Sequence, residues 1–207
     1  MTEPAITWSI PFRPLEKAII DRLQAEDHAQ REAGLPVAAR TRNVTPETGA
    51  FLWQAVVAHH PAAILEIGSS NGLSTMILAS AASRIGATVL GTEIIPERVD
   101  QNNRQLAEAG LGAVAEVINE DHRTSDRVHA RTWDFVFLDA EKDDYLPHLQ
   151  AILPYLAPGA VILTDNVISH DCRTFQSFVR TSPQFSTFTI PLDRGLEYSV
   201  YLGAEDA

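Results

Sequence analysis

The sequence predicts an α/β protein built on a Rossmann-like, doubly wound sheet of seven strands with helices on both faces. From residue 62 to residue 164, short apolar runs alternate with segments of helical period, which is typical of right-handed βαβ units and a mostly parallel sheet. Two further strand-like runs flank Asp193-Arg194-Gly195, a connection so short that it joins only antiparallel neighbours. We therefore expect the sheet to end in an antiparallel C-terminal hairpin.

Local signals define each element. Pro14 suits a first helical turn, and Gly34 followed by Pro36 ends that helix. Thr45 followed by Pro46 indicates the N-cap and first position of a second helix. Residues 1 to about 12 and residues 37–44 are expected to be irregular. The expected helices are Pro14 to about Ala33, Pro46 to about His60, Leu73–Arg84, Pro96–Ala109, His122–Ala130, Asp144–Leu156 and Asp171–Thr181. The expected strands are Ala62–Ile67, Thr88–Glu93, Val114–Ile118, Trp133–Leu138, Ala160–Thr164, Phe185–Pro191 and Leu196–Leu202.

Length and composition indicate one globular domain. With 207 residues, residues 1–45 are expected to form an N-terminal helix and a cover over substrate and cofactor, and residues 46–207 the core. A net charge of −11 argues against nucleic-acid and anionic membrane surfaces as partners. Cys172 is the only cysteine, and neither a secretory signal nor a transmembrane run is recognisable. A reducing, cytoplasmic location is the expectation.

The turn after the first expected strand, Glu66 to Gly72, indicates a nucleotide-like cofactor. In open α/β sheets ligands bind beyond the carboxyl ends of the strands. Ser70 replaces the middle glycine of the dinucleotide fingerprint, so the close approach of a pyrophosphate is disfavoured, and with it a dehydrogenase. Glu66 suits a cationic ligand, and Glu93, at the end of the next strand, suits ribose hydroxyls. S-adenosylmethionine fits this set, while a tight turn without a ligand is the alternative.

Oxygen ligands follow the fourth and fifth expected strands. Asp139 ends one and Asp165-Asn166 ends the next, so their side chains are expected to meet at one edge of the sheet. Carboxylate and amide oxygens without Cys or His favour Mg²⁺ or Ca²⁺, and so few protein ligands favour Mg²⁺. The alternative for Asp139 alone is an N-cap of the next helix. The sequence thus predicts a divalent cation site.

Lys142 lies three residues beyond Asp139. On composition alone it is a solvated surface charge. Beside a bound dication and partly buried, it would give up its proton more readily and act as a general base. The role of Lys142 as a general base therefore depends on the prediction of a metal site.

At these residues the chain resembles the cation-dependent O-methyltransferases, which include the catechol and caffeoyl-CoA enzymes. The motifs are FLDAEKDDYLPHL, ILTDNVI, ILEIGSSNGLST, GTEIIPERV and RGLEYSVYLG, within roughly Arg40 to Gly203. The resemblance implies methyl transfer from S-adenosylmethionine to a hydroxyl of a small acceptor. It implies Lys142 as general base and Asp139, Asp165 and Asn166 as metal ligands. The residues it assigns to the cofactor are Val44, Glu66, Gly68, Ser69, Ser74, Glu93, Asp121, His122 and Asp139.

Glu197 matches a glutamate that binds a substrate hydroxyl in the catechol enzyme. If the sixth strand runs parallel to the fifth, the last strand starts at the carboxyl edge and Glu197 lies beside the site; an exposed glutamate on an edge strand is the alternative. Where the catechol enzyme has an apolar gate, this chain has Arg40, Glu141 and His170, which argues against a plain hydrophobic catechol. Arg40 and Arg42 could serve an anionic acceptor or be surface residues.

Two other functional classes remain as alternatives. A methyltransferase acting on protein or nucleic-acid nitrogen is disfavoured by the acidic charge and by the lack of an Asn-Pro-Pro-Tyr type motif. A non-catalytic cofactor-binding protein is disfavoured because the metal set and Lys142 are both present. The first helix and the terminal hairpin could each form a dimer face, so a homodimer is expected.

Overall fold

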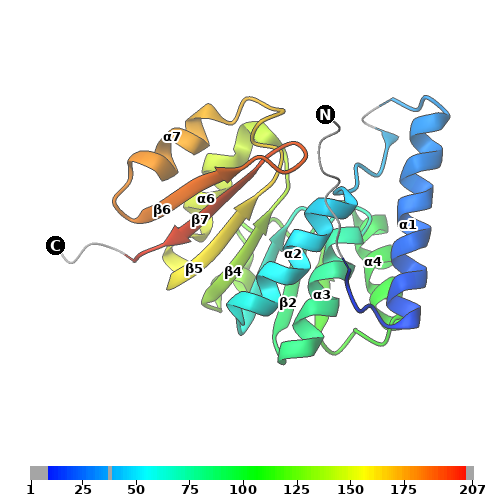
Figure 1. Cartoon of the computed structure of the whole chain (residues 1–207). Coiled ribbons are helices and arrows are strands. Elements are labelled where there is room, and N and C mark those ends of the chain that lie inside the picture. The colour runs from blue at the N-terminus through cyan, green and yellow to red at the C-terminus, as the bar shows by residue number, and fades with distance from the viewer. Residues whose placement is uncertain (1–8, 37–38, 204–207) are drawn as a thin grey trace.

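A computed structural model describes residues 9–36 and 39–203. Its centre is a seven-stranded sheet with the strand order β3-β2-β1-β4-β5-β7-β6 (Figure 1). The strands are β1 (Ala63–Ile67), β2 (Thr88–Thr92), β3 (Ala115–Ile118), β4 (Trp133–Leu138), β5 (Leu156–Thr164), β6 (Phe185–Ile190) and β7 (Leu196–Tyr201). β1 to β5 are parallel, and β7 is antiparallel to both β5 and β6. The predicted fold class is confirmed, including the antiparallel hairpin.

Helices cover both faces of the sheet. The helices are α1 (Pro14–Glu32), α2 (Pro46–His59), α3 (Leu73–Ile85), α4 (Pro96–Glu108), α5 (Asp126–His129), α6 (Tyr145–Ile152) and α7 (Arg173–Thr181). α2, α3 and α4 pack on one face with α1 outside them, and α5, α6 and α7 cover the other (Figure 1). The Thr45 hydroxyl accepts a hydrogen bond from the Thr48 amide, so the predicted N-cap of α2 is confirmed. None of the helices in residues 9–36 and 39–203 is long and apolar enough to cross a membrane.

Two predicted helices were too long. The helix expected over 122–130 is only the single turn α5. The Thr124 amide donates to the Asp121 carbonyl in a turn, and Ser125 is the N-cap of α5, its hydroxyl accepting from the Val128 amide. The helix expected over 144–156 is α6 flanked by the 3-10 turns Lys142–Asp144 and Leu153–Tyr155. The strand expected from residue 160 already begins at Leu156, where it pairs with Trp133 across a register shift.

Strand order fixes where a ligand can bind. The chain leaves β1 toward β2 on one side and returns to β4 on the other, so a crevice opens at the carboxyl ends of β1 and β4. The irregular start expected for residues 1 to about 12 lies mostly outside the described residues, as do residues 37 and 38 of the expected loop. The division into a cover of residues 1–45 and a core of residues 46–207 stays a prediction.

Candidate active site

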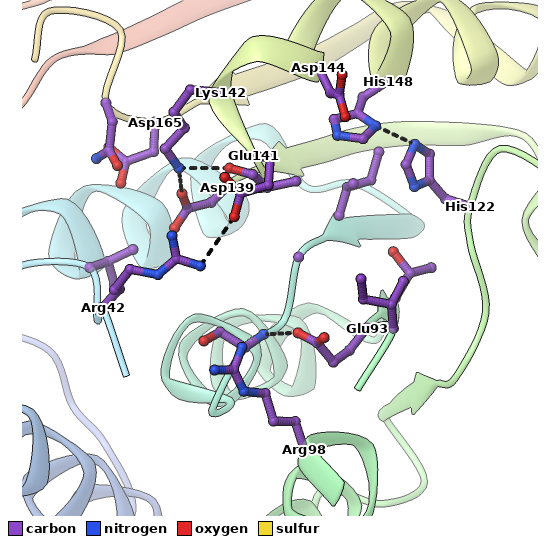
Figure 2. A pocket seen from close by; sticks show the side chains of 18 of the residues that line it. Arg42, Glu93, Arg98, His122, Asp139, Glu141, Lys142, Asp144, His148 and Asp165 are labelled. Atoms are coloured by element: carbon purple, nitrogen blue, oxygen red, sulfur yellow. Dashed lines mark hydrogen bonds and ion pairs between the residues drawn. The ribbon is translucent and has the colours of Figure 1, made fainter. Parts of the chain in front are cut away.

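A cavity of about 380 Å³ lies along the carboxyl ends of the parallel strands (Figure 2). Nine of the predicted site residues line it, whereas Glu66, Ser69, Ser74 and Glu197 are not among its described lining residues. The nine are Val44, Gly68, Glu93, Asp121, His122, Asp139, Lys142, Asp165 and Asn166. Topology alone therefore brings residues more than 120 positions apart into one hollow.

The turn after β1 is shaped for close backbone contact. Gly68 has φ +94, and a Cβ there would lie 2.6 Å from the Asp139 carbonyl oxygen, so any side chain would collide with the loop after β4. Ser70 has φ +48, and its amide donates to Glu93 Oε2 at 2.9 Å. The Ile95 amide donates to Glu93 Oε1 at 3.0 Å. Glu93 is thus fixed at the end of β2 with its carboxylate on the cavity wall.

Glu66 lies directly beneath this turn and is fully buried. Its Oε2 accepts hydrogen bonds from Ser69 Oγ at 2.7 Å and from Thr75 Oγ1, while its Oε1 has no partner among the described residues. Burial raises the pKa of Glu66 to about 7, although the neighbouring hydroxyls oppose that rise. A buried carboxylate with an unused oxygen is suited to a cation supplied by a ligand.

The opposite end of the cavity gathers Asp139, Lys142, Asp165 and Asn166. Lys142 Nζ donates to Asp139 Oδ1 at 2.5 Å and to the Ala140 carbonyl at 2.9 Å (Figure 2). Asp165 is 3% exposed, and its Oδ1 has no hydrogen-bond partner in the described part of the chain. Burial, followed by the charge of Asp139, raises the pKa of Asp165. Two carboxylates and one amine therefore share a poorly solvated corner.

These residues fit a divalent cation in their chemistry. Within residues 9–36 and 39–203, no cluster of three or more His, Cys, Asp or Glu side chains of the metal-holding kind occurs. The predicted set contains two carboxylates, and its third ligand, Asn166, is an amide outside those residue types. The bare Asp165 Oδ1 and an all-oxygen donor set suit a hard cation such as Mg²⁺. The cation itself stays a prediction.

A buried histidine pair forms the wall beyond Glu93. His122 Nε2 lies 3.1 Å from His148 Nδ1 of α6, and both side chains are at most 6% exposed (Figure 2). Burial, followed by the charge of His148, lowers the pKa of His122 to about 4, and burial lowers the pKa of His148 as well. The pair is therefore neutral at pH 7. No sequence pattern pointed to His148 as a site residue, apart from its position on the same helical face as Tyr145.

Asp121 is the more exposed neighbour of this pair. Its carboxylate accepts hydrogen bonds from the Arg123 guanidinium, which lower the pKa of Asp121 to about 2. Asp121 thus stays charged at the cavity rim.

Glu197 follows the predicted backbone course, but its side chain turns to the other side. Residue 197 pairs with Thr164 at the carboxyl end of β5, as the topology argument required. Its buried carboxylate accepts hydrogen bonds from Arg180 Nε at 3.1 Å and from Thr189 Oγ1 at 2.6 Å. Burial opposes ionisation, yet Arg180, Thr189 and Gln176 outweigh it and lower the pKa of Glu197. The structure places Glu197 beneath α7 and does not bring it to the cavity, so its contact with an acceptor stays a prediction.

The three residues expected in place of an apolar gate, Arg40, Glu141 and His170, all line the cavity. Arg40 Nε donates to the Leu35 carbonyl, and Glu141 pairs with Arg42 at 3.4 Å. The cavity wall near Asp139 and Lys142 is therefore polar. Sequence reasoning missed Asp193 and Arg194 of the hairpin turn, which also line it.

Comparison with known proteins agrees with this geometry. Residues 65–167 match a family described as "Methyltransferase domain". The chain is 34% identical over 167 residues to a probable O-methyltransferase of Mycobacterium tuberculosis, covering 75% of this chain and 71% of that protein. It is 31% identical over 176 residues to catechol O-methyltransferase B of Danio rerio, covering 78% and 66%.

Solved structures share the fold over most of their length. An O-methyltransferase from Bacillus cereus in complex with SAH has a TM-score of 0.74 at 24% identity, covering 93% of this chain and 92% of that one. The O-methyltransferase TomG from Streptomyces achromogenes, in complex with SAM, has a TM-score of 0.72 at 25% identity, covering 87% and 89%. The fold, together with the cavity at the carboxyl ends of β1 and β4, defines a class I S-adenosylmethionine-dependent methyltransferase. Within that class the chain belongs to the O-methyltransferase family.

Proposed function

We propose that this chain transfers the methyl group of S-adenosylmethionine to a hydroxyl of a small catechol-like acceptor, with Mg²⁺ and with Lys142 as general base. The observation that carries the proposal is the grouping of Asp139, Lys142 and Asp165 at one end of the cavity, within reach of the turn after β1. The catechol O-methyltransferases among the relatives support the same acceptor class, as does the name of a caffeoyl-CoA relative from Zea mays.

The cofactor is proposed to lie along the β1–β2 side. Glu66, which lies behind the described cavity lining with Ser69 and Ser74 around it, is proposed to attract the cationic end of the cofactor. Glu93, which lines the cavity, is proposed to accept hydrogen bonds from the ribose hydroxyls. Gly68 leaves room for the ligand beside the backbone. Val44 covers the methionine portion, while Asp121 and His122 border the adenine. Bound there, the cofactor supplies an electrophilic methyl group to whatever lies at the Asp139 end.

Asp139, Asp165 and Asn166 are proposed to hold the cation, which when bound lowers the pKa of a phenolic hydroxyl and orients it. Lys142 Nζ, which contacts Asp139 and the Ala140 carbonyl, would take the proton of that hydroxyl in its neutral amine form and become an ammonium. Lys142 is mostly buried, with its side chain 15% exposed, so the cavity wall excludes most water from the amine. The protein contributes orientation and a proton acceptor more than covalent chemistry.

The proposal is tested by removing one of the two carboxylates of the proposed metal set. Asp165→Ala should reduce methyl transfer to 3,4-dihydroxybenzoate and related catechols by about 1000-fold or more, a loss of about 4 kcal/mol, because orientation and activation vanish together. Cofactor affinity, measured by calorimetry with S-adenosylhomocysteine, should change less than threefold. Asp171→Asn is the matched control, since Asp171 is exposed and, among residues 9–36 and 39–203, hydrogen-bonds Arg173 alone.

Chelation provides the second arm. Excess EDTA should abolish turnover of the unaltered protein, and added Mg²⁺ should restore it. Full turnover in EDTA would overturn the metal role, and turnover of no catechol at all would move the acceptor to another class. The homodimer and the cytoplasmic location stay predictions, and light scattering of the purified chain decides the first.

A further inference from the structure

Two arginines from segments distant in sequence line the cavity that holds Asp139, Lys142 and Asp165, whose end we call the acceptor end. Arg42 belongs to the segment between α1 and α2, and Arg194 belongs to the turn between β6 and β7. Arg42 reaches across to Glu141, the neighbour of Lys142, as Figure 2 shows. The Arg194 carbonyl accepts hydrogen bonds from the Ile168 and Ser169 amides, which fastens its turn to the loop after Asn166. Both arginines therefore line the cavity that also contains the proposed metal set.

The hairpin turn lies beside the loop that follows Asp165 and Asn166. The Val167 amide donates a hydrogen bond to the Gly195 carbonyl at 3.1 Å. Gly195, with φ +88, packs so tightly against Ile168 that a Cβ would lie 2.3 Å from its Cγ1. The turn thus has a fixed position beside the acceptor end, and Arg194 projects from it onto the cavity wall.

The backbone under Arg42 is equally well held. Arg42 itself has φ +52, an uncommon conformation for a residue other than glycine. Thr41 donates through its amide to Gln30 and through its hydroxyl to Asp27, and Asn43 Nδ2 donates to the Leu23 carbonyl. These bonds tie both neighbours of Arg42 to α1. An anchored base of this kind lowers the ordering cost when a ligand engages the guanidinium.

The two arginines are held more loosely than Arg127 and Arg173. Arg42 lies 3.4 Å from Glu141, and Arg194 lies 3.9 Å from Asp193, beyond the range of a good charge-assisted hydrogen bond. Arg127, by contrast, pairs with Glu116 at 2.5 Å. Arg173 pairs with Asp171 at 2.6 Å even though its side chain is 86% exposed. An exposed arginine can therefore pair tightly, which Arg42 and Arg194 do not.

The cavity is less acidic than the chain as a whole, whose net charge is −11. Seven of the sixteen lysines and arginines line it, against eight of the 27 aspartates and glutamates. Two of these carboxylates form tight ion pairs, Asp121 with Arg123 and Asp139 with Lys142. Arg42 and Arg194 keep hydrogen-bond capacity for a ligand, because a guanidinium has five N–H donors.

We propose that Arg42 and Arg194 together bind a carboxylate of the acceptor, so that the preferred substrates are catechols that carry an acidic group away from the hydroxyls. This inference rests on the proposed function and specifies its substrate class. A carboxylate matches the planar guanidinium and can engage two N–H groups at once. The vicinal oxygens of the same molecule then point to Asp139, Asp165 and Lys142.

The test compares two acceptors that differ in charge and little in ring electronics, 3,4-dihydroxybenzoate and 3,4-dihydroxybenzamide. For the unaltered protein kcat/KM should favour the acid by about tenfold or more, as expected for charge-assisted hydrogen bonds. Arg42→Gln and Arg194→Gln should each reduce this preference by about threefold or more, and the double variant should bring it close to one. The loss should fall on the acid and leave the amide within twofold. Raising the salt concentration should also reduce the preference.

Arg173→Gln is the control, because Arg173 has a tight exposed partner and is not among the described lining residues. It should leave the preference unchanged. Equal kcat/KM for acid and amide in the unaltered protein would overturn the inference, as would variants that lower both substrates equally. Methylation of neither compound would instead contradict the proposed function, so the two failures are distinguishable.

Discussion

Two buried glutamates at strand ends show how differently the sheet uses the same side chain. Glu66 at the end of β1 and Glu197 at the start of β7 are both 0% exposed. Hydroxyls contact Glu66, and burial raises its pKa to about 7. Arg180 contacts Glu197, and the pKa of that carboxyl is lowered despite its burial. The hydrogen-bonding neighbours of each carboxyl therefore decide its charge state. Glu66, beneath the turn after β1, is the one without a cationic partner in the described structure.

The largest expected effect is on the pH dependence of stability. A carboxyl whose folded pKa is raised stabilises the fold below its unfolded pKa, and this contribution is lost as the pH rises through the folded value. For Glu66 the window runs from 4.5 to about 7, and the loss approaches about 3 kcal/mol. Glu66→Gln should remove this slope from the cofactor-free protein. Urea unfolding at several pH values measures it, and identical slopes in the two proteins would contradict the assignment.

Cofactor affinity should separate the two glutamates next. Glu66→Gln should weaken S-adenosylhomocysteine binding by about thirtyfold, since about 2 kcal/mol is typical for a hydrogen bond to a charged group. Glu197→Gln should change the affinity less than twofold, because its carboxylate contacts α7 and β6. Calorimetry at pH 8, where Glu66 is charged, provides both numbers. Equal losses in the two variants would break the comparison.

A smaller effect is expected from Arg180, which is half exposed. Arg180→Leu removes the guanidinium from a buried carboxylate and should cost about 2 kcal/mol of unfolding free energy after allowance for solvent screening. Adding Glu197→Gln should recover part of that loss, since the remaining group is then neutral. A double-mutant cycle in urea measures the coupling. Strict additivity would show that the ion pair contributes nothing.

The smallest expected effect concerns turnover. Because the Glu197 carboxylate already accepts hydrogen bonds from Arg180, Thr189 and Gln176, we expect Glu197→Gln to lower kcat/KM for 3,4-dihydroxybenzoate by less than about threefold. A loss of tenfold or more, with stability unchanged, would restore the acceptor contact that the family resemblance implies. Glu93→Gln, at a residue that lines the cavity, provides the kcat/KM with which the Glu197 variant is compared.

Much of the fold was predictable because it follows from local patterns. Alternating apolar runs gave the strand positions within a few residues, and the short Asp193–Gly195 connection gave the antiparallel end of the sheet. The helix over 122–130 failed because competing turn and cap hydrogen bonds at Asp121 and Ser125 are not visible in periodicity. The extra length of β5 arises from pairing with β4, a tertiary contact.

The sequence by itself determined the strand-end residues: Glu66 and Glu93 on one side, Asp139 and Asp165 on the other. The carboxyl ends of parallel strands meet at one edge of the sheet, so polar residues at these ends are brought close together. Only the tertiary structure decided which side chains face the cavity. The Glu197 side chain does not reach the cavity, because Arg180 binds its carboxylate. Arg194 and His148 line the cavity, because their elements pack beside residues distant in sequence. Side-chain direction depends on such neighbours, which no local pattern encodes.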